Sequence, residues 1–203
     1  EGCLERHYKK GTEEETVNYH CDVLEAKIVL GEKLIVSIGS EFIENNGEDA
    51  ERQKNMGEEE RKQDCETKAF RRLAGKIKKA FPRLPVIVLA DSLYASDPVM
   101  DICRGNGWGF IIRYKSGSIP SIAEEYKKIP EKWEAGQAEF VNEIDYNGKP
   151  VNMVKYWEER EEKGKKVRKE YQFLTDIRLT EKNAEKVVEA GRKRWKIENE
   201  GFN

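Results

Sequence analysis

Residues 86–115 constrain the fold of this chain more than any other stretch. The run "VIVLA" (86–90) is apolar at every position, which is typical of a central strand covered on both faces of a sheet. Residues 96–98, Ser-Asp-Pro, then begin a helix with a capping residue and a proline in the first turn. A Gly-Asn-Gly sequence ends this helix before "WGFIIRYK" (108–115), which predicts the next strand. This order predicts two parallel strands joined by a crossover helix, and therefore an α/β fold.

The segments on either side add an antiparallel hairpin and two further helices. Residues 15–30 alternate apolar and polar side chains and turn at Gly31 into a second strand, "KLIVSIGSEFI" (33–43). Residues 58–81 have helical spacing, and a final helix begins with Thr180 as its cap and continues to the end of the chain. The apolar face of the earlier helix consists of Phe70, Leu73, Ala74, Ile77 and Phe81.

Residues 116–180 have a different character. Three prolines, the Asn147-Gly148 turn and the short strands "VNMVKYW" and "KEYQFLTDI" predict a β-rich segment before the final helix. The sequence as a whole therefore predicts a mixed sheet flanked by helices, with a β-rich insertion ahead of the last helix.

The composition limits the classes of function that fit. Of the 203 residues, 37% are charged and 37% are hydrophobic, and no apolar run reaches the roughly 18 residues of a membrane span. We therefore expect a soluble, cytoplasmic protein, which four scattered cysteines also suit. The net charge of −2 does not by itself predict a nucleic-acid binder, although Lys and Arg are clustered along the chain. A set of zinc-type ligands lies near the start, but its spacing matches no standard finger. These are Cys3, His7, His20 and Cys21.

Asp91 directly follows the apolar strand 86–90. In open α/β sheets, ligands bind beyond the carboxyl ends of the strands, so this position suits a site residue. An aspartate that caps the turn with its own side chain fits the position equally well.

Glu198 is the second acidic residue that requires an explanation. It falls on a stripe of the last helix that is otherwise apolar or small, so a buried carboxylate there needs a cation, either Arg194 one turn earlier or a metal ion. The other members of the stripe are Ala184, Val188, Gly191, Trp195 and Phe202. Gly191 in the middle of a helix costs about 1 kcal/mol relative to Ala, which indicates that another element approaches closely there. Two carboxylates placed in this way suit Mg²⁺ and phosphodiester chemistry.

Three segments together resemble the DDE transposases of bacterial insertion sequences, which have an RNase H-like catalytic core. They are "VIVLADSLYAS" around the second acid, "GWGFIIRYK" as the strand after it, and "GRKRWKIENEGFN" around the third acid. The family's third acid lies in a Tyr-x2-Arg-x3-Glu-x6-Lys signature, which Arg194 and Glu198 match. Gly191 stands in place of the Tyr, and the Lys would lie two residues beyond Asn203. The resemblance covers roughly residues 17–203.

The resemblance implies that Asp91 and Glu198 are catalytic acids that bind Mg²⁺ or Mn²⁺. It implies DNA as the partner, both transposon ends and target, with self-association on DNA, no membrane, and a nucleoid-associated location in the bacterial cytoplasm. The expected DNA-binding residues are Lys115, Arg192, Arg194 and Lys196. Trp195 is expected in the core, Tyr94 either in the core or beside DNA, and Asp176 in a turn near the site.

The resemblance also divides the chain. Residues 1–115 would form the RNase H-like core, 116–180 the β-rich insertion, and 181–203 a truncated catalytic helix. Both ends look cut, and we expect the first strand of the core, with its Asp, upstream of residue 1. The chain would then be a fragment of a transposase.

Three alternatives stay open at this stage. The first is an inactive or domesticated remnant that binds DNA or a partner without catalysis. The second is another RNase H-like nuclease with Asp22 as its first acid, although Asp22 would lie in the middle of a strand. The third is an α/β domain in which Asp91 only caps a turn and Glu198 only pairs with Arg194.

Overall fold

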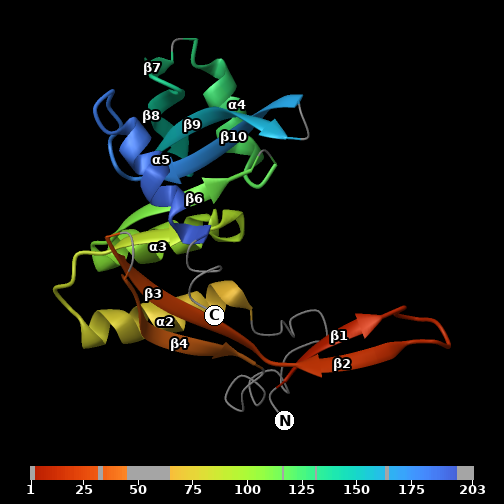
Figure 1. Ribbon diagram of the computed structural model, residues 1–203. Coiled ribbons are helices and arrows are strands. Elements are labelled where there is room, and N and C mark those ends of the chain that lie inside the picture. The colour runs from red at the N-terminus through yellow and green to blue at the C-terminus, as the bar shows by residue number, and fades with distance from the viewer. Residues whose placement is uncertain are drawn as a thin grey trace. The chain divides into compact units, whose positions relative to one another are not determined.

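The computed structural model places the chain in two compact units, Glu1–Pro82 and Arg83–Asn203 (Figure 1). The residues that it describes are 3–31, 34–44, 65–115, 117–130, 132–162 and 165–195. None of the helices in these ranges is long and apolar enough to cross a membrane. The second unit contains Asp91 and most of the residues predicted to form the site.

The first unit contains two antiparallel hairpins and a helix. The predicted hairpin is confirmed as β3 (Asp22–Leu30) and β4 (Leu34–Ile43), which turn at Gly31 with a φ of 63°. A second hairpin, β1 (Leu4–Tyr8) with β2 (Thr16–His20), was not predicted. The expected continuous strand 15–30 is therefore wrong, because it is divided between the two hairpins at Cys21.

The helix α2 (Glu66–Ala80) packs against β4. Gly39 allows the close approach, because a Cβ at this position would lie 3.2 Å from Leu73 Cδ1. Leu73, Ala74 and Ile77 are buried as predicted, whereas Phe81 is 43% exposed and does not belong to the packing face. The predicted start of this helix at residue 58 lies outside the described residues.

The second unit is built on one six-stranded sheet in the order β5-β6-β10-β9-β8-β7. As predicted, β5 (Ile87–Ala90) and β6 (Gly109–Tyr114) are parallel and are joined through α3 (Asp97–Asn106). The other neighbouring pairs are antiparallel. The expectation that residues 86–90 form a central strand is wrong for this sheet, since β5 lies at its edge and Ile87 is 53% exposed.

The β-rich segment before the last helix is confirmed, and it continues the sheet that β5 and β6 begin. Its strands are β7 (Trp133–Ala135), β8 (Ala138–Tyr146), β9 (Lys149–Glu162) and β10 (Lys165–Thr175). The predicted turn joins β8 to β9, and both of its residues have positive φ, 54° at Asn147 and 75° at Gly148. The segment also contains a helix that was not predicted, α4 (Pro120–Lys128).

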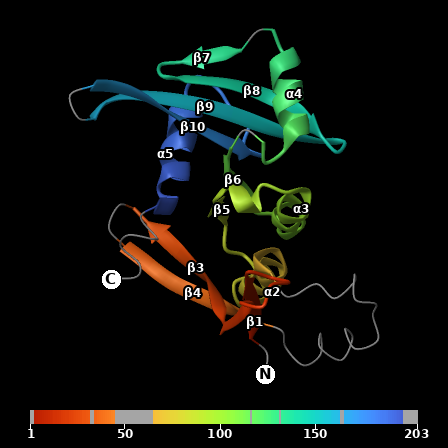
Figure 2. The same ribbon diagram turned by 90° about the vertical axis from the view of Figure 1, so that its right-hand side faces the viewer.

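Helices cover both faces of this sheet. Figure 2 shows α5 (Ala184–Arg192) on one face and α3 and α4 on the other. Ala184 and Val188 of α5 are buried in a cluster that includes Ile111, Val154 and Phe173 of the sheet. The mixed sheet flanked by helices is therefore as predicted.

The last helix begins later than the sequence indicates. Thr180 is exposed and does not cap it, and Asn183 occupies the N-cap position instead. The Asn183 side chain accepts a hydrogen bond from the Thr180 backbone amide at 2.8 Å and donates to the Arg178 carbonyl at 2.9 Å. These bonds close a turn over residues 180–183, so regular helix starts at Ala184.

Candidate active site

Asp91 is held at the carboxyl end of β5 by the turn that follows. Its Oδ1 accepts a hydrogen bond from the Leu93 backbone amide at 2.9 Å and caps the single 3₁₀ turn η1 (Ser92–Tyr94). Capping is therefore one role of this side chain. The second carboxylate oxygen, Oδ2, makes no hydrogen bond or ion pair with any residue that the structure describes, so it is available to a ligand.

Asp91 opens into a cleft of about 530 Å³. The lining comes from four parts of the second unit, namely the turn after β5, the end of β6 with the residue after it, β10, and the end of α5 with the residues that follow it. The lining residues are Asp91, Ser92, Arg113, Lys115, Tyr171, Phe173, Gly191, Arg192, Arg194 and Trp195. Four of these described residues are cations and one is an acid, so the described lining carries a net positive charge in a chain whose overall charge is −2.

Gly191 determines how closely α5 approaches the sheet beneath the cleft. A Cβ at Gly191 would lie 2.6 Å from Phe173 Cε1 and 2.9 Å from Ile111 Cγ2. No larger residue fits unless the helix or the sheet moves. The sequence-based inference that another element approaches Gly191 closely is confirmed, and this contact fixes the position from which Arg192 and Arg194 enter the cleft.

Arg113 is half-buried in the floor of the cleft beside two aromatic rings. Its guanidinium carbon lies 4.8 Å from the centre of the Tyr171 ring and 5.3 Å from that of Phe173. Nη2 donates to the Glu170 carbonyl at 3.1 Å. Nη1 is buried, and no described residue accepts a hydrogen bond from it. An unpaired buried donor is costly, and an anion in the cleft would relieve that cost if the guanidinium turned to meet it.

The positive charges of the cleft act on one another. Burial lowers the pKa of the Arg113 guanidinium, and the nearby charges of Arg194 and Arg192 lower it further. Arginine nevertheless stays protonated at every physiological pH. Tyr171 and Glu170 act in the opposite sense and offset part of this lowering, so Arg113 stays a charged group beside the other cations of the cleft.

Arg192 also contacts Tyr171, and it forms an ion pair with Glu158. Its guanidinium carbon lies 4.8 Å from the Tyr171 ring centre, and its Nη1 lies 3.1 Å from Glu158 Oε2. The Tyr171 hydroxyl donates to the other oxygen of Glu158 at 3.1 Å. These contacts with Tyr171 and Glu158 hold the Arg192 side chain in one orientation at the cleft.

Residues 61–200 match the model of the transposase DDE domain. The chain belongs to the DDE transposase family. The match includes both predicted acids, Asp91 and Glu198. No curated protein matches the chain. The mixed sheet flanked by helices is compatible with the RNase H-like fold of such domains, which act on DNA and generally use divalent metal ions.

The transposase domain brings four of the six predicted site residues together. Asp91, Lys115, Arg192 and Arg194 all line the cleft. Glu198 and Lys196 lie outside the described residues.

The predicted environments of Trp195 and Tyr94 have different outcomes. Trp195 is 49% exposed and lines the cleft, so its predicted place in the core is wrong. Tyr94 is 9% exposed and belongs to the core. Asp176 follows β10 and accepts a hydrogen bond from the Phe110 backbone amide of β6 at 2.8 Å, so its side chain links these two strands and does not line the cleft.

Arg113, Tyr171 and Phe173 are cleft residues that sequence reasoning missed. A signal for Arg113 was present, since it is the one charged residue within the apolar strand Gly109–Tyr114. Tyr171 and Phe173 gave no such signal, because their position depends on β10 pairing with β6, for example Phe173 with Arg113.

The alternative metal ligands do not assemble in the first unit. No group of three or more His, Cys, Asp and Glu side chains suited to a metal ion occurs among the described residues. His7 contacts Glu5 and Glu15, and His20 lies 3.6 Å from Asp22. Asp22 is the first residue of β3 and not, as expected, in the middle of a strand.

Proposed function

We propose that Asp91 and Glu198 are two acids of the DDE triad and that the cleft beside Asp91 binds DNA for phosphodiester hydrolysis and strand transfer. The observation that carries this proposal is the presence of Asp91 in one cleft with Arg113, Lys115, Arg192 at the end of α5 and Arg194 just beyond it. The family membership supports the reaction class, and the excess of cations supports a polyanionic substrate.

The donor chemistry fits Mg²⁺ or Mn²⁺. Asp91 offers one carboxylate oxygen that no described residue uses, and carboxylate oxygen is the donor that Mg²⁺ prefers. Glu198 follows Arg194 by one helical turn in the sequence and would supply the second carboxylate. Bound divalent ions in such a site activate the attacking oxygen and stabilise the leaving one.

The chain's own residues would bind and orient the DNA backbone. Arg113 lines the cleft, and its guanidinium is held by the Tyr171 and Phe173 rings, so a phosphate oxygen could accept a hydrogen bond from it with little further ordering of the side chain. Lys115 is exposed at the end of β6 and adds a point charge. Arg194 would contact phosphate or orient Glu198.

The finer points of the proposal concern origin and organisation. The Arg194–Glu198 spacing supports the signature type of bacterial insertion-sequence transposases, with 116–180 as the insertion between core segments 1–115 and 181–203. Self-association on DNA belongs to the same proposal. Asp22 is a poor first acid, because it begins a strand, whereas ligand-binding residues of such sheets follow the strands.

A second candidate function is DNA binding without cleavage. Four cleft cations against one described acid favour retention of DNA even where catalysis is lost. The two functions differ in their response to Asp91→Asn. Removal of this negative charge would strengthen metal-free DNA binding in both cases, but it would abolish divalent-dependent cleavage only in an active transposase.

The DNA site is tested with a labelled duplex and fluorescence anisotropy over a range of salt concentrations. Lys115→Gln should weaken binding and reduce the slope of log K against log salt by about 0.9, the value for one lost phosphate contact. Arg113→Lys should also weaken binding although it keeps the charge, because an ammonium group cannot reproduce the stacked fork of donors.

Lys127→Gln is the matched control. Lys127 is an exposed lysine of α4, on the opposite face of the sheet from α5, and does not line the cleft. It should leave the affinity and the salt slope unchanged. Equal losses in Lys115→Gln and Lys127→Gln would show that DNA binds through diffuse charge, and the proposed cleft would be rejected.

A further inference from the structure

Cys3 and Cys21 are 18 residues apart in the sequence, but the first hairpin brings their sulfur atoms together. The Cys21 thiol donates a hydrogen bond to Cys3 Sγ over 3.4 Å. The pairing of Leu4 with His20 explains this proximity, because the two cysteines flank that pair at the end of the ladder. A disulfide bond is about 2.05 Å long, so the two sulfurs need to approach by little more than 1 Å.

Both thiols can be reached from solvent. Cys21 is exposed and Cys3 is partly exposed. The other two cysteines serve as internal references, since Cys65 is exposed and Cys103 is buried. From the sequence, Cys3 and Cys21 were grouped only as candidate zinc ligands with His7 and His20, and their direct contact depends on the pairing of β1 with β2.

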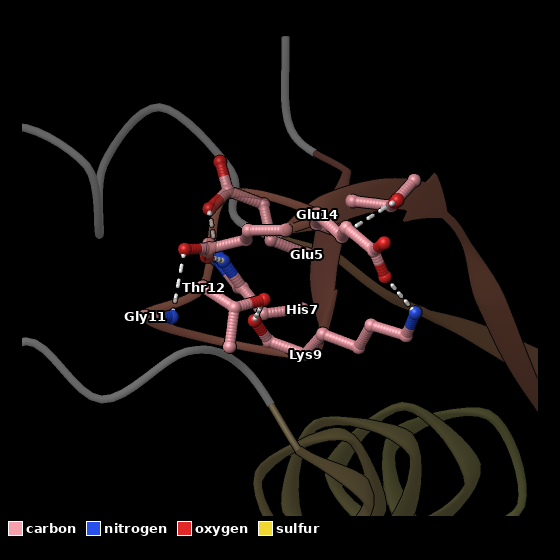
Figure 3. Close-up of polar contacts among 8 residues, drawn as sticks. Glu5, His7, Lys9, Gly11, Thr12 and Glu14 are labelled. Carbon is pink, nitrogen blue, oxygen red and sulfur yellow. Dashed lines mark hydrogen bonds and ion pairs between the residues drawn. The ribbon is translucent and has the colours of Figure 1, made fainter.

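The opposite end of the same hairpin is closed by polar contacts. Figure 3 shows the turn between β1 and β2, where His7 Nδ1 lies 2.6 Å from Glu15 Oε1 and the Gly11 amide donates to Glu15 Oε2 at 3.0 Å. Lys9 forms an ion pair with Glu14 across the same turn. Among the described residues, β1 pairs only with β2, and an isolated two-stranded hairpin is marginally stable. A covalent bond between Cys3 and Cys21 would therefore hold together the end of the hairpin that lies opposite the turn.

We propose that Cys3 and Cys21 form a reversible disulfide bond by exchange with small-molecule disulfides. One cysteine thiolate attacks a small disulfide, forms a mixed disulfide and releases one small thiolate. The second cysteine thiolate then attacks the mixed disulfide at the first cysteine's sulfur and releases the second small thiolate. Two cysteine thiols are thus oxidised, one small disulfide is reduced to two thiols, and no other oxidant is needed.

The hydrogen bond between the thiols sets the pH dependence of this exchange. The bond to Cys3 raises the pKa of the Cys21 thiol above its ordinary value, and burial raises it further. The thiolate is the reactive form, so exchange should accelerate as the pH rises towards 9. The proposal is independent of the DNA cleft, because both cysteines belong to the first unit.

The test is oxidation of the whole chain with excess oxidised glutathione, followed by alkylation of free thiols, tryptic digestion and mass spectrometry. Trypsin cuts between the two cysteines, so the bond would link peptide 1–6 to peptide 11–27. The expected result is that this linked pair is the main disulfide product and that Cys65 carries glutathione. Cys3→Ser should convert Cys21 to a glutathione adduct.

Either of two results would overturn the proposal. One is separate glutathione adducts on Cys3 and Cys21 in the wild-type chain. The other is a yield of Cys21–Cys65 linkage equal to that of Cys3–Cys21. Hydrogen exchange gives a second readout, since oxidation should slow the amides of β1 and β2 by about tenfold or more and leave those of β9 and β10 unchanged. Unchanged exchange in β1 and β2 would show that the bond does not stabilise the hairpin.

Discussion

Replacement of Gly191 by alanine tests whether close packing of α5 determines the geometry of the cleft. The new Cβ would meet Phe173 Cε1 at 2.6 Å, Phe173 Cδ1 at 2.8 Å and Ile111 Cγ2 at 2.9 Å. Carbon atoms pack at about 3.5–4.0 Å, so α5 has to move by about 1 Å. Neither partner can yield easily, since Phe173 is 3% and Ile111 1% exposed. Overpacking of this kind costs about 1–3 kcal/mol, against a gain in helix propensity of about 1 kcal/mol. We expect a net loss of up to about 2 kcal/mol in the free energy of unfolding.

Urea unfolding followed by circular dichroism measures this loss. Gly105→Ala is the control, because Gly105 lies in α3 and a Cβ there meets no atom within 4 Å. It should leave the stability unchanged or raise it by up to about 1 kcal/mol. Phe173→Leu combined with Gly191→Ala should recover part of the loss relative to the sum of the two single changes, since the residues are in contact. If Gly191→Ala were as stable as the wild type and bound DNA equally well, the packing argument would be refuted.

Three further predictions concern buried and titrating groups. Glu41 is 8% exposed. Burial raises the pKa of its carboxyl group, but hydrogen bonds from Lys76 and Arg72 lower this pKa below the usual value. The ionised Glu41 therefore stabilises the fold fully above about pH 4.3, and this contribution is lost as the pH falls through the lower pKa of the folded state. Glu41→Gln should lower the urea midpoint at pH 7, and the midpoint of this variant should decline less steeply towards pH 3 than that of the wild type. The hydrogen bond to Glu15 raises the pKa of His7, so its NMR titration should have a midpoint above 6.5 that Glu15→Gln lowers. Asn152 is buried, with hydrogen bonds to the Glu143 amide and the Ile177 carbonyl, so Asn152→Ala should cost about 1–3 kcal/mol in urea unfolding.

Local signals in the sequence were sufficient for the central elements. The fully apolar run 86–90, the Ser-Asp-Pro helix start and the Asn147-Gly148 turn each depend on neighbouring residues, and each prediction is confirmed as an element type. Gly191 was also informative, because a glycine in an amphipathic helix has few explanations other than close contact.

The errors arise where distant pairing decides the outcome. An apolar strand does not reveal its place in the sheet, so β5 was expected in the centre although it lies at the edge. The strand Leu4–Tyr8 has four exposed residues among five, and only its partner β2 makes it a strand. Thr180 was a plausible cap, but the hydrogen bonds of Asn183 displaced the helix start to Ala184.

The candidate site was predicted in part for the same reason. Asp91, Arg192 and Arg194 carry chemical signals in the sequence itself, and the cleft contains them. Trp195 was expected in the core, but it is 49% exposed and lines the cleft, three residues beyond the end of α5. Arg113 became recognisable only when its aromatic neighbours on β10 were in place.

The most direct test of the central claim is titration of the ¹⁵N-labelled chain with Mn²⁺. If Asp91 holds the divalent ion of a DDE transposase, the paramagnetic ion should first broaden the amide signals of residues 91–93 and of the cleft end of α5. The Asp91→Asn variant should lose this broadening, keep its fold and bind metal-free DNA more tightly than the wild type, as expected for the loss of a negative charge from the cleft. Equal broadening in Asp91→Asn and wild type, or broadening confined to acidic residues outside the cleft, would contradict the assignment of Asp91 as a metal-binding acid.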